Sequence, residues 1–192
     1  MYVPVKNICD LTKMIKTTYE EKDLNRLAKY LNIVVAYRPM GKRPTSCKGF
    51  YIVISRIKHI TVNSDLLEEE QGIILAHEIG HAALNHSTEI IRDFQLFPTK
   101  NHMEIEANIF AAELLLYDDE VLERLYDGYS FSEIAKDLIV YPELLAYKFY
   151  AMESRGINEL NSPIGIKPDF LKSFSQECHV EENDESDSWW ES

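Results

Sequence analysis

Apolar residues recur with helical spacing over the first 31 positions of the chain. A polar stretch, KTTYEEKD (16–23), divides the pattern and predicts a break between two helices. The apolar positions are Ile8, Leu11, Met14 and Ile15, then Leu24, Leu27, Ala28 and Leu31.

Three short β-branched stretches follow and predict strands. The first, NIVVAYRP (32–39), ends at a proline. The other two, 50–55 and 59–62, flank a turn at 56–58 and predict a hairpin. Such a hairpin leaves at least one sheet edge exposed.

The rest of the pattern is helical. A long helix is predicted over 66–86, with Asn63, Ser64 and Asp65 as N-cap candidates and Glu68 in capping-box position. Gly80 lies inside this helix and predicts that another backbone passes close to it. Further helices are predicted over 102–117, 118–126 and 131–153, the last interrupted near residue 142. These elements together predict an α+β fold.

Composition narrows the class of protein. With 192 residues and 45% hydrophobic content, the chain can bury one sizeable domain, or one domain with a small appendage. No apolar run approaches the roughly 20 residues of a membrane span, and the first residues lack a secretory signal. Three widely spaced cysteines predict no disulfide framework, which agrees with a cytoplasmic protein.

The net charge of −12 argues against general nucleic-acid binding. The acidity is concentrated after residue 176, where seven acids occur without a lysine or arginine. This part of the chain also carries Trp189 and Trp190, and we expect residues 157–192 to form a linker and a disordered acidic tail.

The stretch HEIGH places His77 and His81 four residues apart on one face of the predicted helix, so that both imidazoles can reach one metal ion. Glu78 is offset by about 100° and can act as the base for a water on that metal. The pattern H-E-x-x-H is typical of zinc peptidases. A solvated helix that carries these residues by chance is the alternative.

A third ligand is needed, and no histidine follows in the metzincin pattern. The stretch MEIEANIFAAELL (103–115) offers Glu104, Glu106 and Glu113. Glu104 shares a face of small residues with Asn108, which is placed to hydrogen-bond a ligand histidine, so Glu104 is favoured. Glu106 stays as the alternative third ligand, although the helix face that carries it is expected to point to solvent. Glu113 is interpreted as a surface acid.

The paired stretches HEIGHAALNH and EIEANIFAAELLL resemble the ImmA/IrrE metallopeptidases of bacteria and mobile elements. The resemblance spans at least residues 49–116. It implies a small gluzincin-like domain with His77 and His81 as Zn²⁺ ligands, Glu78 as catalytic acid/base and a glutamate from EIEAN as third ligand.

The region 129–149 resembles a helix-turn-helix, but its second helix offers only Lys148 as a basic residue. A structural or docking role for this helical pair is therefore favoured over DNA binding. We expect a metallopeptidase domain over 1–125, the helical pair over 126–156 and the linker and tail over 157–192. The histidines outside the motif, His86 among them, have no ligand-like spacing.

Taken with the resemblance, these features predict an intracellular zinc peptidase that cleaves a helix-turn-helix repressor of a phage or mobile element. The substrate would bind the hairpin edge in extended form. The alternative is a non-catalytic, zinc-stabilised antirepressor that acts by binding its partner.

Overall fold

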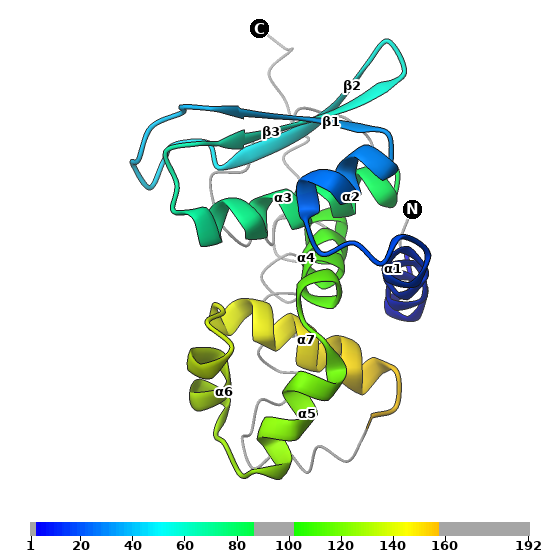
Figure 1. Cartoon of the computed structure of the whole chain (residues 1–192), viewed down its shortest axis with the longest axis vertical. Helices are drawn as coiled ribbons and strands as arrows, with labels where there is room; N and C mark the ends of the chain where they lie inside the picture. The colour runs from blue at the N-terminus through cyan, green and yellow to red at the C-terminus, as the bar shows by residue number, and fades with distance from the viewer. Residues whose placement is uncertain (1–2, 87–101, 158–192) are drawn as a thin grey trace, which may run out of the picture.

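The computed structural model describes residues 3–86 and 102–157, which form an α+β fold as the sequence predicts (Figure 1). The three strands are β1 (Ile33–Arg38), β2 (Gly49–Ile54) and β3 (Ile57–Asn63). The described helices are α1 (Val5–Tyr19), α2 (Leu24–Tyr30), α3 (Glu68–Ala83), α4 (His102–Leu115), α5 (Asp118–Tyr126), α6 (Phe131–Asp137) and α7 (Pro142–Ser154).

The sheet has the order β1-β3-β2, with β1 parallel and β2 antiparallel to β3. The β2–β3 turn consists of Ser55 and Arg56, which have φ values of 52° and 67°. Positive φ at both positions is typical of the tight turn that matches strand twist. The predicted turn at 56–58 was therefore wrong in its position, because Ile57 and Lys58 already belong to β3.

The described helices all lie on one side of the sheet (Figure 1). Helix α3 packs directly beneath the sheet, and α4 packs against the opposite side of α3. A Cβ added at Gly80 of α3 would lie 3.2 Å from the Cα of Ala107 and 3.1 Å from the Cβ of Phe110. The close backbone approach predicted at Gly80 is thus confirmed, and the second backbone is that of α4.

The predicted N-cap of α3 was wrong. The helix begins at Glu68 with Leu67 as N-cap, and the carboxylate of Glu70 accepts a hydrogen bond from the Leu67 N–H. Asn63 is buried, and its side-chain amide donates to the carbonyls of Gly41 and Cys47. The side-chain oxygen, which an N-cap would use as acceptor, accepts instead from the N–H groups of Met40 and Asp65, so it is not available to the helix.

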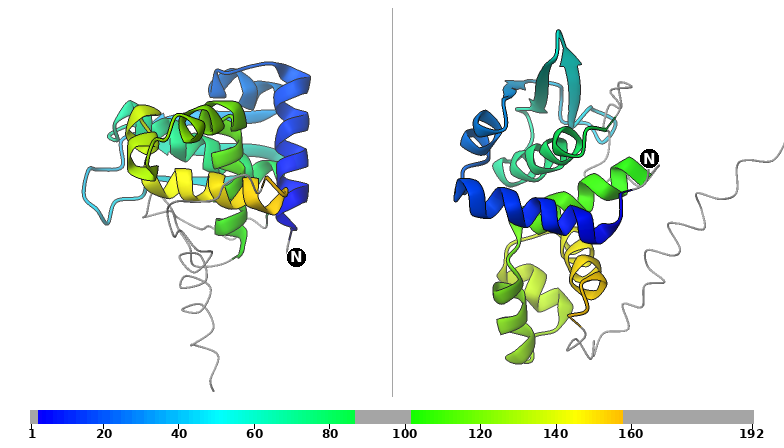
Figure 2. Two further views of the ribbon diagram at one scale, coloured as in Figure 1. Left: turned by 90° about the horizontal axis from the view of Figure 1, so that it is seen from below. Right: turned by 90° about the vertical axis from the view of Figure 1, so that its right-hand side faces the viewer.

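Helix α1 lies against α4 (Figure 2), and α7 packs on both α4 and α1. Glu113 of α4 is 6% exposed, so its interpretation as a surface acid was wrong. Its carboxylate accepts from Lys148 at 2.9 Å and from Arg155 at 3.0 Å. Asp118 also pairs with both cations, at 2.6 Å from Lys148 and 2.7 Å from Arg155. A buried ion cluster therefore joins α4, α5 and α7.

Lys148 is 1% exposed inside this cluster. It is the basic residue that the second helix of the helix-turn-helix-like pair would need for contact with DNA phosphates. Its burial removes it from the surface. Among the residues that the structure describes, no helix is long and apolar enough to cross a membrane.

Candidate metal centre

Two histidines and one glutamate converge between α3 and α4. His77 and His81 come from α3, and Glu104 comes from the first turn of α4. The His77 Nε2 lies 2.9 Å from the His81 Nε2, and Glu104 Oε2 lies 3.3 Å from the former and 3.5 Å from the latter. All three side chains are buried. The sequence placed these residues in one site, and the structure brings them together.

The three distances fit one metal ion. Two atoms that each lie about 2.0–2.1 Å from a tetrahedral ion of zinc's size are roughly 3.3 Å apart. The two imidazole nitrogens and the carboxylate oxygen are 2.9–3.5 Å from one another. Two imidazoles and a carboxylate are also a common donor set for divalent transition metals. The residues present therefore fit a metal ion with three protein ligands.

Asn108 fixes the orientation of His77. Its Oδ1 lies 2.9 Å from the His77 Nδ1, and since an amide oxygen only accepts, the Nδ1 carries the proton. The Nε2 of His77 then presents its lone pair to the centre. The Asn108 amide donates in turn to the Tyr147 hydroxyl of α7 at 3.3 Å. The hydrogen bond that the sequence predicted between Asn108 and a histidine of HEIGH is thus present, and the histidine is His77.

His86 fixes the orientation of His81 in the same way, and sequence reasoning missed it. Its Nδ1 lies 2.8 Å from the His81 Nδ1, and its Nε2 lies 2.9 Å from Glu106 Oε2. The Nε2–H of His86 donates a hydrogen bond to the carboxylate of Glu106, so the Nδ1 of His86 carries no proton. This Nδ1 therefore accepts a hydrogen bond from the Nδ1–H of His81. The Nε2 of His81 then presents its lone pair to the centre.

Glu106 is therefore linked to the three converging residues through His86, which contacts both Glu106 and His81. It is 2% exposed, so the expectation that it faces solvent was wrong. Its second oxygen accepts from the Val3 N–H at 2.7 Å, which ties the residues before α1 to the centre. The spacing of residues along the helix could not show that Glu106 is buried, because the residues that cover it, His86 and Val3, lie outside its own helix.

Glu78 is buried beside the first strand of the hairpin. A Cβ on Gly49 would lie 3.3 Å from Glu78 Oε1 and 2.5 Å from the Ile74 side chain. Glycine at this position lets β2 approach α3, so the start of β2 lies next to the Glu78 carboxylate.

Ionisation in the centre follows from the contacts. Burial raises the pKa of the Glu104 carboxyl, but in the metal-free centre the His77 and His81 rings, when they carry a proton on Nε2, outweigh burial and bring the pKa to about 2; a bound metal ion would replace those protons. Glu104 is therefore an anion at neutral pH, as a metal ligand must be. Burial raises the pKa of Tyr147 to about 12, so its hydroxyl keeps its proton.

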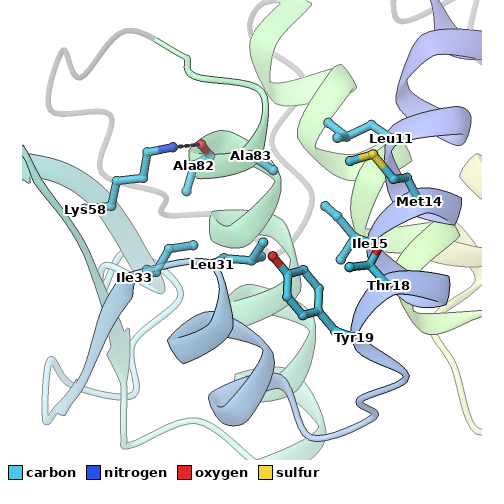
Figure 3. Close-up of a pocket in the computed structure, with 10 residues that line it drawn as sticks. All are labelled: Leu11, Met14, Ile15, Thr18, Tyr19, Leu31, Ile33, Lys58, Ala82 and Ala83. Carbon is cyan, nitrogen blue, oxygen red and sulfur yellow. Dashed lines mark hydrogen bonds between the residues drawn. The ribbon is translucent and has the colours of Figure 1, made fainter.

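A separate hollow of about 330 Å³ lies between α1, the start of β1 and the end of α3 (Figure 3). Its lining is mostly aliphatic and contains no histidine or carboxylate. The ammonium of Lys58 is held there by the Ala82 carbonyl at 2.6 Å. This hollow offers no group for hydrolysis.

The fold and the converging residues define a zincin-like metallopeptidase domain. Residues 28–150 match the family described as the IrrE N-terminal-like domain (Peptidase_M78), and the chain belongs to this family. A similar relative is "Uncharacterized immunity region protein 2" of Bacillus phage phi105. It is 34% identical over 119 residues, which cover 61% of this chain and 73% of the relative.

Proposed function

We propose that the protein is a zinc-dependent peptidase in which His77, His81 and Glu104 hold the metal and Glu78 is the catalytic base. The observation that carries the proposal is the convergence of three ligand atoms within 3.5 Å of one another. Two histidines and one glutamate leave a fourth position open, which is typical of catalytic rather than structural zinc sites.

Zinc in this donor set supplies Lewis acidity that lowers the pKa of water to roughly 7. The protein's own residues do the rest. Asn108 and His86 hold the two imidazoles in the tautomers that present Nε2. Glu78 takes a proton from the attacking water and passes it to the departing amine of the peptide bond.

The substrate of this peptidase is proposed to be a helix-turn-helix repressor of a phage or mobile element, bound in the cytoplasm. The name of the phage relative, an immunity region protein, supports this setting. Strand β2 pairs with β3 on one side only among the described strands, so its other edge can accept an extended peptide. Because β2 starts beside Glu78, a peptide on that edge runs toward the proposed base.

The test uses the full chain and the repressor encoded nearest to its own gene. The two purified proteins are mixed with zinc, and fragments are followed by gel and mass spectrometry. We expect one or a few discrete cuts that a chelator abolishes and added zinc restores. A repressor that stays intact in every zinc-containing mixture would contradict the proposal.

The antirepressor alternative is favoured by one observation, the burial of the centre. His77, Glu78 and Glu104 are each 1% exposed, as is usual for a metal that stabilises a fold. Under this alternative the partner is bound but not cut. Release of the repressor from its operator without fragments would support it.

A further inference from the structure

The sheet face that points away from the helices is apolar and open among the described residues. The described helices cover the opposite face (Figure 1). The strand register places alternate side chains on the open face. Val34, Ile54 and Ile57 are 49%, 52% and 49% exposed there. The outward side chains, termed the open sheet face, are Val34, Ala36, Phe50, Ile52, Ile54, Ile57, His59 and Thr61.

Basic side chains border this face at both ends of the strands. Every charged residue between positions 33 and 64 is a lysine or arginine, although the chain has a net charge of −12. Within the described part of the chain, no ion pair joins the basic residues at the border to an acid. These residues, termed the basic rim, are Arg38, Lys42, Arg43, Lys48 and Arg56.

An apolar face with an unpaired basic border calls for a partner that is both acidic and aromatic. Residues 177–192 have this composition: seven acids, no lysine or arginine, and Trp189 and Trp190. The 19 residues from 158 to 176 can span roughly 60 Å at full extension. Covalent linkage also gives the segment an effective concentration on the order of millimolar.

We propose that residues 177–192 dock on the open sheet face, with their carboxylates against the basic rim and the two tryptophans on the apolar side chains. Docking would bury an apolar surface that otherwise favours self-association. It would also place the segment beside β2, without involving any residue of the metal centre.

The chain provides its own probe, since Trp189 and Trp190 are its two tryptophans. Tryptophan emission of the full chain therefore reports on this segment alone. We expect emission at shorter wavelength than in the urea-unfolded protein, because docked indoles leave water. Raising NaCl to about 1 M should shift the emission toward the unfolded value, because the rim contacts are exposed and salt screens them.

A charge-reversal variant tests the location. Changing Arg38, Lys42, Arg43 and Arg56 together to Glu should give the unfolded-like emission even at low salt. The control reverses four exposed lysines on helices, Lys6, Lys13, Lys29 and Lys136, which changes the net charge equally and should leave the emission at short wavelength. Far-UV circular dichroism and thermal unfolding establish that both variants are folded.

Three results would overturn the proposal. The first is a wild-type emission equal to that of the unfolded chain. The second is a rim variant that is folded and keeps the short-wavelength emission. The third is an emission that shifts with protein concentration, since this would show that the segment docks on a second copy.

Discussion

The Nδ1 atoms of His81 and His86 lie 2.8 Å apart, although His86 follows the end of α3 and lies five residues from His81. The chain reaches this position because Asn85 has a φ of 54°, a left-handed conformation that asparagine tolerates well. The histidine thereby turns back over the last turn of the helix. Glu106 accepts from its other nitrogen and completes a chain of contacts from α4 to the proposed ligand.

This relationship predicts that His86→Ala weakens zinc binding about 10–100-fold, because His81 loses the partner that sets its tautomer. Zinc affinity is measured by competition with a chromogenic chelator, which does not depend on activity. His59→Ala, on the open sheet face, is the control and should bind zinc like the wild type. Unchanged affinity in His86→Ala would show that His86 is only a packing residue.

The second prediction separates the two candidate glutamates. Glu104→Gln should lower the zinc content of the purified protein steeply, because it removes the anionic donor that faces both imidazoles. Glu106→Gln should keep zinc with at most about a tenfold loss of affinity, because it acts through His86. The reverse order of the two effects would assign Glu106 as the third ligand.

The third prediction concerns the contact between α3 and α4. Alanine in place of a helical glycine normally adds about 1 kcal/mol of stability. Gly80→Ala should instead destabilise the protein by about 1–3 kcal/mol, since its Cβ meets the backbone of Ala107. Gly72→Ala, in the same helix with open space around it, is the matched control and should be stabilising. Urea unfolding of both variants measures the difference, and equal effects would refute the close contact.

The fourth prediction concerns the buried ion cluster. Lys148→Ala should lower the free energy of unfolding by about 3 kcal/mol, because Glu113 and Asp118 lose a buried cationic partner. Lys136→Ala, an exposed change on α6, should stay within about 0.5 kcal/mol of the wild type. A Lys148→Ala protein as stable as the control would mean that Arg155 alone neutralises both acids.

Much of the fold follows from local patterns. The helix that bears His77 was predictable because apolar spacing and the metal motif agree along one stretch. The strands were predictable from β-branched runs bounded by Pro39 and Gly49. The position of Glu104 opposite the two histidines was predictable, because the small residues on its face of the helix allow α4 to approach α3.

The features that sequence reasoning missed depend on contacts between distant segments. Glu113 is buried because it pairs with Lys148 of α7 and with Arg155 directly after α7, which lie 35 and 42 residues further along the chain. Glu106 is buried because His86 and Val3 reach it. Asn63 does not cap the helix, since its side-chain oxygen accepts from the N–H groups of Met40 and Asp65 and its amide donates to two loop carbonyls. A charged residue inside an otherwise apolar helix, such as Glu113 or Lys148, was the available signal for such pairing.

In the proposed function, Glu78 acts as the base of a zinc peptidase. Glu78→Gln keeps the size of the side chain and removes its ability to take a proton, so zinc content and repressor binding should equal those of the wild type. Loss of a general base typically lowers the rate by about two to four orders of magnitude. The measurement is the rate of repressor fragmentation by the zinc-loaded Glu78→Gln protein, with a reporter under the repressor's control in parallel. We expect fragments and derepression to be lost together; derepression at the wild-type level without fragments would contradict the peptidase and support the antirepressor.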